Sequence, residues 1–454
     1  MRTRFTWIVA ILALVAIGAL IACGTTYSSS SNGLVVVPSN GSALVQSFSL
    51  DLSNGHVSQI NNGNGPSITG LPGSVILDPA GAYAYVASSV DCTPANLPAN
   101  TSLSAVQGAI LAYKVNSDGK LSAPGAPQYL SGNPAYPSGG PNAFPTCGLD
   151  DTTNPNAGNP PAAITMDSAG KFLFVATAPV SAIYTIDLDT TPIPMVAPLN
   201  SVGVAVYAIG SNASLTQVAG SPFALPPQTG GQASPSALAV TPTVFPPLFA
   251  ACSGHTAPTT EYLYVTDKVN NVILNYLVDP SAGTLTLGTT TGMPTGTLPS
   301  GAAVDPCNRF VYVANATTNN VSAYTICSAI LLPSCQHADY SLVAVADSPY
   351  AAGDVPGPLA VDPYANFVYV VDTGSSQLSS FRISPSSGSL TAMGTVTTNS
   401  GPNSIAIRSD DSWIFVANFN SANVSQYALT PATGALTPQS PTTTDNNPTG
   451  VAVK

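Results

Sequence analysis

The sequence is poor in charge and in the residue types that usually carry acid–base chemistry. Of its 454 residues, 10 are Lys or Arg, 21 are Asp or Glu and 3 are His, so charged residues make up 7% of the chain. Because nucleic-acid binding needs a cationic surface, nucleic acid is not expected as a partner. General acid–base catalysis needs a side chain that titrates near the working pH, and the three histidines and the one glutamate, Glu261, leave few candidates.

Several motifs and one kind of hydrophobic run are missing as well. No C-x-x-C spacing occurs, which disfavours a zinc site. No G-x-S-x-G elbow with a partnered His occurs, which disfavours a serine hydrolase. After residue 22 no stretch approaches the roughly 18 consecutive apolar residues of a membrane-spanning helix. Disorder is not expected, because the 44% of apolar residues recur in ordered blocks.

The N-terminus has the form of a bacterial lipoprotein signal. A positive start is followed by an uncharged apolar run over residues 7–22, and the run ends in the sequence LIAC, which resembles a lipobox with Cys23 as the lipidated residue. The sequence therefore predicts a signal peptide over 1–22 and a lipidated flexible tether over 23–32. An uncleaved transmembrane anchor is the alternative, although the run is shorter than the about 20 residues that a bilayer span needs.

Removal of the signal peptide also fixes the expected charge and address of the mature chain. Loss of Arg2 and Arg4 leaves 8 Lys and Arg against 21 Asp and Glu, a formal net charge of −13. Gly24 rather than an aspartate follows the cysteine, and resemblance to known sorting signals then favours the outer membrane over the inner one. We expect a protein of the bacterial cell envelope that is anchored to a membrane by the lipid on Cys23.

A repeat runs through the rest of the chain. Residues 361–372 align without gaps with residues 304–315, and each copy contains two β-rich stretches joined by a turn of Asp, Pro and small residues, which predicts a hairpin. Two further short strands follow each hairpin, and four strands per repeat are typical of a β-propeller blade. The other copies lie at 77–88, 166–177 and 407–418, with one copy split by an insertion into 238–240 and 262–265.

The two ends of the chain complete one blade. The last repeat copy stops after one strand, near Val451, whereas residues 34–37 and 45–48 fit the second and third strands of the same blade. Six whole blades and this shared one predict an all-β, seven-bladed β-propeller over residues 33–454, with no open sheet edge. An outer-membrane barrel is the alternative, but its strands alternate apolar and polar residues, whereas stretches such as 310–313 are apolar on both faces.

The repeat resembles that of the YVTN-repeat, lactonase-like seven-bladed propellers. The residues that carry this resemblance are FVYVAN at 310–315, WIFVAN at 413–418 and GSPF at 220–223, and the likeness spans essentially the whole mature chain. The resemblance is specific for the fold and only weakly informative about function, because one fold hosts many activities.

Lactonase-like enzymes, by this resemblance, carry ionisable groups at the mouth of the central channel, near the start of the innermost strand and after the second strand. After the second strand, the corresponding positions of this chain include Asn315-Ala316 and Asn418-Phe419. We therefore predict no intact catalytic site, no cofactor and no metal. Asp150, Asp151 and His255 are the candidates for a site rebuilt from inserted loops. The start-of-strand positions, none of which titrates, read Gly73-Ser74, Ala162-Ala163, Ser236-Ala237, Ser300-Gly301, Gly357-Pro358, Asn403-Ser404 and Thr449-Gly450.

Two sets of hairpin residues could be interpreted as functional sites, but each has a structural explanation. A column of aspartates suggests calcium, but an Asp at the head of a tight turn usually caps its own backbone. Glu261 shares a column with Lys171 and Arg309, and side chains in this column are expected to point to solvent. The aspartate column consists of Asp78, Asp167, Asp305 and Asp362.

Six cysteines remain after Cys23, and an even number in an exported chain favours disulfides. In a propeller the turns between the first and second strands, and between the third and fourth, lie on one face, while the other connections lie on the opposite face. Six cysteines allow about 15 connectivities, and some could instead stay as buried free thiols. The most local connectivity pairs Cys252 with Cys307, Cys92 with Cys147, and Cys327 with Cys335.

Three functions are compatible with these features. The first is an envelope-anchored binding or scaffold module, without an intact catalytic site, whose inserted loops bind an envelope protein or a polysaccharide. The second is a lactonase-like hydrolase, related to the 6-phosphogluconolactonases, that acts on a lactone or sugar-derived substrate; the charge of −13 disfavours an anionic one. A purely structural or assembly role is a third. The long insertions lie at 89–107, 123–160, 178–202 and 241–260.

Overall fold

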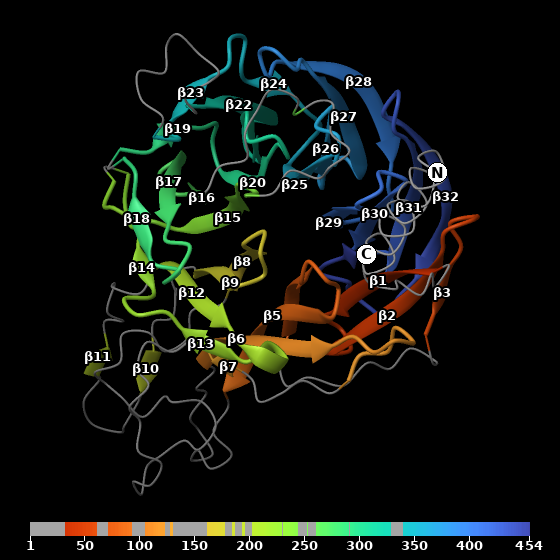
Figure 1. The fold of residues 1–454 in the computed structure, drawn as a ribbon, viewed down its shortest axis with the longest axis horizontal. Helices are drawn as coiled ribbons and strands as arrows, with labels where there is room; N and C mark the ends of the chain where they lie inside the picture. The colour runs from red at the N-terminus through yellow and green to blue at the C-terminus, as the bar shows by residue number, and fades with distance from the viewer. Residues whose placement is uncertain are drawn as a thin grey trace, which may run out of the picture.

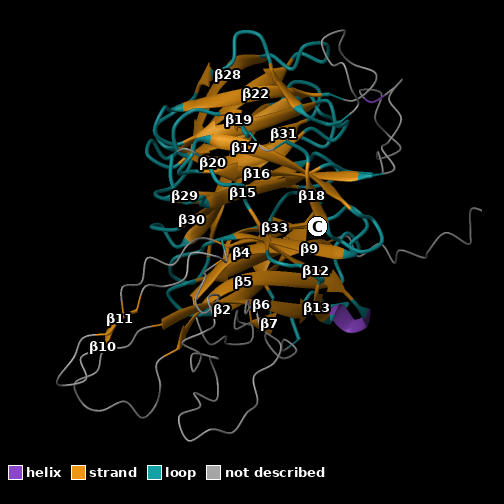
Figure 2. Cartoon of the chain, turned by 90° about the vertical axis from the view of Figure 1, so that its left-hand side faces the viewer, coloured by secondary structure: helices purple, strands orange, loops and turns teal. Residues whose placement is uncertain are grey.

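A computed structural model of the chain shows a ring of β-sheets around a central axis (Figure 1). The model is all-β, as the repeat predicts, and Figure 2 shows strands through its whole depth, with a short 3-10 helix, Ser211–Ala213, beside β13 (Leu215–Gln217). The structure describes residues 32–60, 71–92, 105–122, 128–129, 161–177, 184–186, 193–195, 202–228, 230–243, 252, 260–289, 291–327 and 339–454.

The described strands form seven antiparallel blades, which we number from the N-terminus. In each blade the strands follow one another from the axis outward, and neighbouring strands are hydrogen-bonded. Blade 2 contains β4 (Leu71–Leu77), β5 (Tyr83–Cys92), β6 (Ala105–Lys114) and β7 (Gln128–Tyr129); blade 3 contains β8 (Pro161–Met166), β9 (Phe172–Thr177), β12 (Gly203–Ile209) and β13, with β14 (Phe223–Ala224) on β12. Between β9 and β12 the chain makes a separate hairpin of β10 (Tyr184–Ile186) and β11 (Ile193–Met195).

The remaining whole blades repeat this order. Blade 4 contains β15 (Pro235–Val240), β16 (Glu261–Asp267), β17 (Val272–Val278) and β18 (Leu285–Leu287), with β19 (Met293–Pro294) on β17. Blade 5 contains β20 (Pro299–Val304), β21 (Phe310–Asn315), β22 (Asn320–Ile326) and β23 (Leu342–Ala344), with β24 (Tyr350–Ala351) on β22. Blade 6 contains β25 (Pro356–Val361), β26 (Phe367–Asp372), β27 (Gln377–Ile383) and β28 (Leu390–Thr397), and blade 7 contains β29 (Pro402–Ile407), β30 (Trp413–Asn418), β31 (Asn423–Thr430) and β32 (Ala435–Thr443).

Blade 1 is built from both ends of the chain, which confirms the predicted closure. Its innermost strand is the C-terminal β33 (Ala452–Val453), followed outward by β1 (Asn32–Ser39), β2 (Leu44–Asp51) and β3 (Val57–Gln59). Val36 lies opposite Ala452, and Val35 lies opposite Val453. In Figure 1 the red strands β1–β3 therefore lie beside the blue strands of blade 7.

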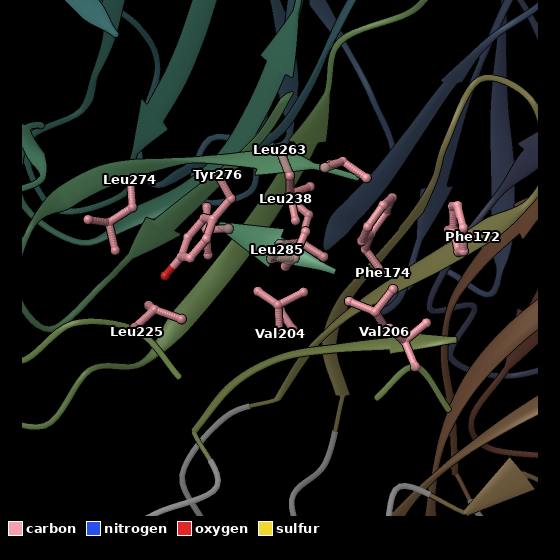
Figure 3. Packing of buried hydrophobic residues seen from close by; sticks show 14 of the residues in the cluster. Phe172, Phe174, Val204, Val206, Leu225, Leu238, Leu263, Leu274, Tyr276 and Leu285 are labelled. Carbon is pink, nitrogen blue, oxygen red and sulfur yellow. The ribbon is translucent and has the colours of Figure 1, made fainter. Parts of the chain in front are cut away.

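The second strand of a blade is buried on both faces, because each blade is stacked between two others. Every residue of β21 is buried, and alternate side chains serve different interfaces. Phe310 and Tyr312 pack with blade 6, whereas Val311 and Val313 pack with blade 4. Figure 3 shows the same arrangement between blades 3 and 4, where side chains of the two blades face each other. This two-residue period explains why the strands are apolar without interruption.

Aromatic side chains of the second strand also fix the distance between blades. The Tyr312 hydroxyl donates to the carbonyl of Gly388 in the next blade at 3.1 Å. Gly388 has φ +74°, and a Cβ there would lie 2.4 Å from Cδ1 of Phe310, so this turn needs glycine. The pair Tyr369 and Gly434 makes the same bond between blades 6 and 7 at 2.9 Å.

A disulfide joins Cys252 to Cys307, the pair that the blade geometry predicts. It connects the insertion in the first hairpin of blade 4 to the matching turn of blade 5, with 5.2 Å between the two Cα atoms. Cys327 is disulfide-bonded too, and its predicted partner Cys335 lies outside the described residues.

Other cysteine and N-terminal predictions fall where the structure describes little. Cys92 ends β5, while Cys147 lies outside the described residues. The predicted signal peptide and Cys23 precede the first described residue, Asn32, so these remain predictions. Among the described residues, no helix has the length and apolarity needed to cross a membrane.

The first hairpin turn of blade 7 contains a buried carboxylate in an unusual setting. The left-handed position of this turn is occupied by Asn308 in blade 5 and by Asp411 in blade 7, with φ +56° and +59°. The Asn308 amide donates to the carbonyl of Pro242 in the preceding blade at 2.7 Å. Asp411 is fully buried, and neither of its carboxylate oxygens has a hydrogen-bond partner. Burial, and then the negative charge of Asp362, raises the pKa of Asp411 to about 7.

We expect the substitution Asp411→Asn to stabilise the fold at alkaline pH. Because the folded-state pKa of Asp411 lies above the usual 3.8, the protonated carboxyl group favours the folded state at pH 4. The wild-type protein loses this contribution to its stability as the pH rises through about 7. An asparagine stays neutral and can donate as Asn308 does, so D411N should raise the free energy of unfolding by about 1–3 kcal/mol at pH 8 and change it little at pH 4. Denaturant unfolding at both pH values measures this, with D118N as the exposed control; an equal effect of D411N at both pH values contradicts it.

We expect loss of the Cys252–Cys307 bond to destabilise the protein. The bond spans 55 residues of sequence, and a cross-link of this kind typically contributes about 2–4 kcal/mol. Thermal unfolding of C252S, C307S and the double variant measures the contribution. Because one bond is removed in all three, their stabilities should be nearly equal, and additive losses or unchanged melting temperatures would contradict the expectation.

Candidate functional site

The mouth of the channel is formed where the innermost strands begin, and most of these strands begin with a bulge. In blades 2 to 7 the register between the first and second strands shifts within the first few residues of the first strand. The shift leaves an extra residue out of the ladder and re-aims its side chain. The residues skipped in this way include Ser236, Ser300 and Asn403, which the sequence places at the mouth.

These mouth residues join each blade to the next one. In each case a hydroxyl or amide donates to a main-chain carbonyl of the following blade, and five successive junctions are bridged. Such bonds use the donors of the uncharged mouth residues for holding the ring together. The bonds run from Ser236 to Pro299 (2.6 Å), Ser300 to Pro356 (2.6 Å), Thr373 to Pro402 (2.8 Å), Asn403 to Pro448 (3.1 Å) and Thr449 to Pro72 (2.8 Å).

The end of the second strand carries carboxylates that the sequence prediction did not include. Blades 5 and 7 have Asn315 and Asn418 at this position, whereas blades 4 and 6 have Asp267 and Asp372, both fully buried. The signal was present in the sequence, because the aligned repeat 361–372 itself ends on Asp372.

In blade 6, Asp372 takes the place of an asparagine that is hydrogen-bonded to a serine in blades 5 and 7. Asn315 donates to the hydroxyl of Ser322 at 3.0 Å, seven residues later, and blade 7 repeats this bond. Asp372 instead accepts a hydrogen bond from the hydroxyl of Ser379, also seven residues later, at 2.6 Å. Burial raises the pKa of Asp372 to about 6.

Asp267 holds the two loops at the mouth of blade 4 together. It accepts hydrogen bonds from the main-chain amide of Ser234 at 3.0 Å and from the side chain of Asn270 at 2.6 Å. One bond therefore fixes the segment that enters the innermost strand, and the other fixes the loop that leaves the second strand.

The aspartate column of the first hairpin caps its own turns, as its position predicts. Oδ1 of Asp305 accepts from the amides of Arg309 and Phe310 at 2.5 and 2.9 Å, and Asp362 and Asp167 do the same in their blades. Among the described residues no group of three or more His, Cys, Asp and Glu side chains is placed to hold a metal ion.

The expectation that Glu261 and Arg309 point to solvent is wrong. Both are buried, with exposed fractions of 6% and 1%, whereas Lys171 in the same column is exposed. Glu261 reaches back to blade 3, where its Oε1 accepts from the amide and the hydroxyl of Ser168 at 2.9 and 2.6 Å. The Ser168 oxygen lies 2.7 Å from the Thr243 hydroxyl. The column therefore lies at the blade interfaces, where a charged side chain finds partners in the neighbouring blade.

A cavity of about 190 Å³ lies beside Glu261, between blades 3 and 4. It is on the face of the ring that carries the first hairpin turns, which we call the turn face. Burial raises the pKa of Glu261, against the hydrogen bonds from Ser168, which lower it. Burial also raises the pKa of Asp167. This face is opposite to the channel mouth. The lining includes Asp167, Lys171, Phe172, Thr243, Glu261 and Pro280.

The candidate residues of the inserted loops, Asp150, Asp151 and His255, all lie outside the described residues. Their role stays a prediction. The structure describes two other candidate sites, namely the hydrogen-bonded residues at the channel mouth and the cavity at Glu261.

The fold and the ring of blades define a seven-bladed β-propeller. A family model described as Lactonase, 7-bladed beta-propeller matches residues 199–330 and 334–453, which is more than half of the chain. The chain therefore belongs to this lactonase propeller family. A search of curated proteins finds no match.

Solved structures show the same fold at low identity. A candidate 6-phosphogluconolactonase from Bacteroides fragilis is 16% identical, with TM-score 0.62, over 95% of this chain and 100% of that one. The Pseudomonas aeruginosa periplasmic gluconolactonase PpgL is 16% identical, with TM-score 0.61, over 93% and 99%. A Lactobacillus plantarum protein is 15% identical, with TM-score 0.61, over 93% and 99%. At such identities the likeness shows the fold alone.

Proposed function

We propose that this chain is a binding module of the bacterial cell envelope, in which the lactonase-family ring is a rigid scaffold without a working hydrolase site at its mouth. The observation that carries the proposal is the set of bonds at the mouth. The hydroxyl and amide donors there bridge successive blades, from Ser236 to Pro299 around to Thr449 and Pro72. Asp267 accepts hydrogen bonds within its own blade, and Asp372 does so through Oδ2, while Oδ1 of Asp372 is buried without a partner. A general acid or base must instead be free to meet the substrate.

A neutral polysaccharide is the ligand that suits such a surface best. Charged residues make up 7% of the chain, and the mature net charge of −13 opposes an anionic ligand. Uncharged hydroxyls and amides form hydrogen bonds with sugar hydroxyls without a charge to neutralise. The inserted loops on the rigid ring are the natural place for contact with such a ligand.

A lactonase-like hydrolase is the second candidate, and membership of the lactonase propeller family supports it. A similar solved structure is named a periplasmic gluconolactonase, which would place such an activity in an exported protein. A catalytic site would then use carboxylates at the mouth, of which Asp372 has the raised pKa, or groups from the inserted loops such as Asp150, Asp151 and His255.

A lactone assay separates the two candidates. Purified mature protein is incubated with glucono-1,5-lactone and with 6-phosphogluconolactone, and acid release is followed against the spontaneous rate. We expect no excess over that rate, because the carboxylates at the mouth are committed to the fold. Turnover by the wild-type protein that is lost in D372N contradicts the proposal. Co-sedimentation with insoluble neutral and anionic polysaccharides is the second arm, and we expect retention on a neutral one.

The lipid anchor is tested separately. We expect full-length protein to fractionate with membranes and C23S to be released as a soluble or uncleaved form, because the thiol of Cys23 is the predicted acceptor of the lipid. Metabolic labelling with a radioactive fatty acid measures modification directly. Labelling of C23S, or the absence of label from the wild-type chain, contradicts the anchor.

A further inference from the structure

At the interface of blades 5 and 6, the guanidinium group of Arg309 fills the space between the first hairpin turn of blade 5 and the first and outer turns of blade 6. We call this space the corner of the interface. The Nε atom of Arg309 lies 2.7 Å from Oδ2 of Asp305, and another guanidinium nitrogen donates to the carbonyl of Ala365 in blade 6 at 3.1 Å. The group also lies 5.1 Å from the ring centre of Phe310. The carbonyl of Pro385, in the outer turn of blade 6, accepts a longer bond at 3.4 Å.

The corner between blades 3 and 4 has the same framework. Phe172 packs against Gly283 of the outer turn just as Phe310 packs against Gly388, with a Cβ on either glycine 2.5 or 2.4 Å from the ring. The aspartate and the outer-turn proline recur as Asp167 and Pro280. These matching contacts place the cavity beside Asp167 where blades 5 and 6 hold the Arg309 side chain.

The two corners differ in the cation they supply. Lys171 takes the position of Arg309 and lines the cavity, but it is exposed and forms no ion pair with a described residue. Blade 4 adds a second carboxylate, Glu261, where blade 6 has Asn366. Ser168 bonds only Oε1 of Glu261, so Oε2 is left for the cavity that Glu261 lines. The corner has gained a negative charge and has lost the internal guanidinium.

We propose that this cavity binds the guanidinium group of a small ligand, which takes the place that the Arg309 guanidinium holds in blade 5. The carboxylates of Glu261 and Asp167 would receive its N–H donors, and the ring of Phe172 would face the cation. The site lies on the turn face, away from the channel mouth, and it does not depend on the proposed binding function.

The size and composition of the cavity define the ligand class further. A volume of about 190 Å³ admits a guanidinium group with a short alkyl chain, since a water molecule takes about 30 Å³. Val278, Pro280 and Phe172 give the alkyl chain an apolar wall. A divalent metal ion fits less well, because calcium takes about six to eight oxygen ligands.

The test is calorimetric titration of the mature protein with N-butylguanidinium, using N-butylurea as an uncharged ligand of similar shape. We expect saturable binding of the first and none of the second. E261Q keeps an oxygen for Ser168 and removes the charge, and we expect at least about tenfold weaker binding, since a hydrogen bond to a charged group contributes about 1.5–3 kcal/mol.

Two further variants make the result unambiguous. K171R places an internal guanidinium beside Asp167, as Arg309 lies beside Asp305, and should abolish binding of the added ligand while the protein stays folded. D118N removes the same charge at an exposed turn of blade 2 and should bind as the wild type does. Absence of binding to the wild type, equal binding of N-butylurea, or unchanged affinity in E261Q and K171R overturns the proposal.

Discussion

The pairing of two short segments from opposite ends of the chain is the constraint on which the ring depends. β33 contributes two residues to blade 1, and without them β1 would be the exposed innermost edge of its sheet. The amide of Lys454 donates to the carbonyl of Leu34 at 2.9 Å, and Thr449 bonds the next blade at Pro72. A ring has no free edge only when this last blade is complete, so the contacts between all seven blades depend on a few terminal residues.

Within the closed ring, the two faces use polar groups differently. At the channel mouth, uncharged donors bridge one blade to the next in a nearly repeating way, which leaves little of the mouth free for acid–base chemistry. On the turn face, one column of the hairpin carries a different side chain in each blade. Arg309 fills the corner between blades 5 and 6, where the facing residue of blade 6 is the neutral Asn366, and Glu261 adds a carboxylate beside a cavity between blades 3 and 4. Sequence variation within one repeated framework therefore leaves a cavity between blades 3 and 4 and a filled corner between blades 5 and 6.

The repeat allowed the fold to be predicted in detail, because alternating burial against two neighbouring blades imposes an apolar strand such as residues 310–313 in each copy. The same reasoning predicted ring closure and the pair Cys252 and Cys307, since both follow from the order of strands in a blade. It failed for Glu261 and Arg309. A place beside a turn predicts exposure to solvent, whereas this column lies at the blade interfaces, where Arg309 contacts blade 6 and Glu261 contacts Ser168 of blade 3. It also did not predict Asp267 and Asp372, because this column carries asparagine in blades 5 and 7 and aspartate in blades 4 and 6.

Hydrogen exchange of the C-terminal segment tests ring closure most directly. A free chain end normally frays and exchanges its amide hydrogens within the dead time of the experiment. If β33 closes the ring, the amides of Ala452 and Lys454, which face β1, should be protected as strongly as those of β30 in the core of blade 7, and they should become exposed together with it in denaturant. Rapid exchange of this segment in a protein whose β30 remains protected would contradict closure.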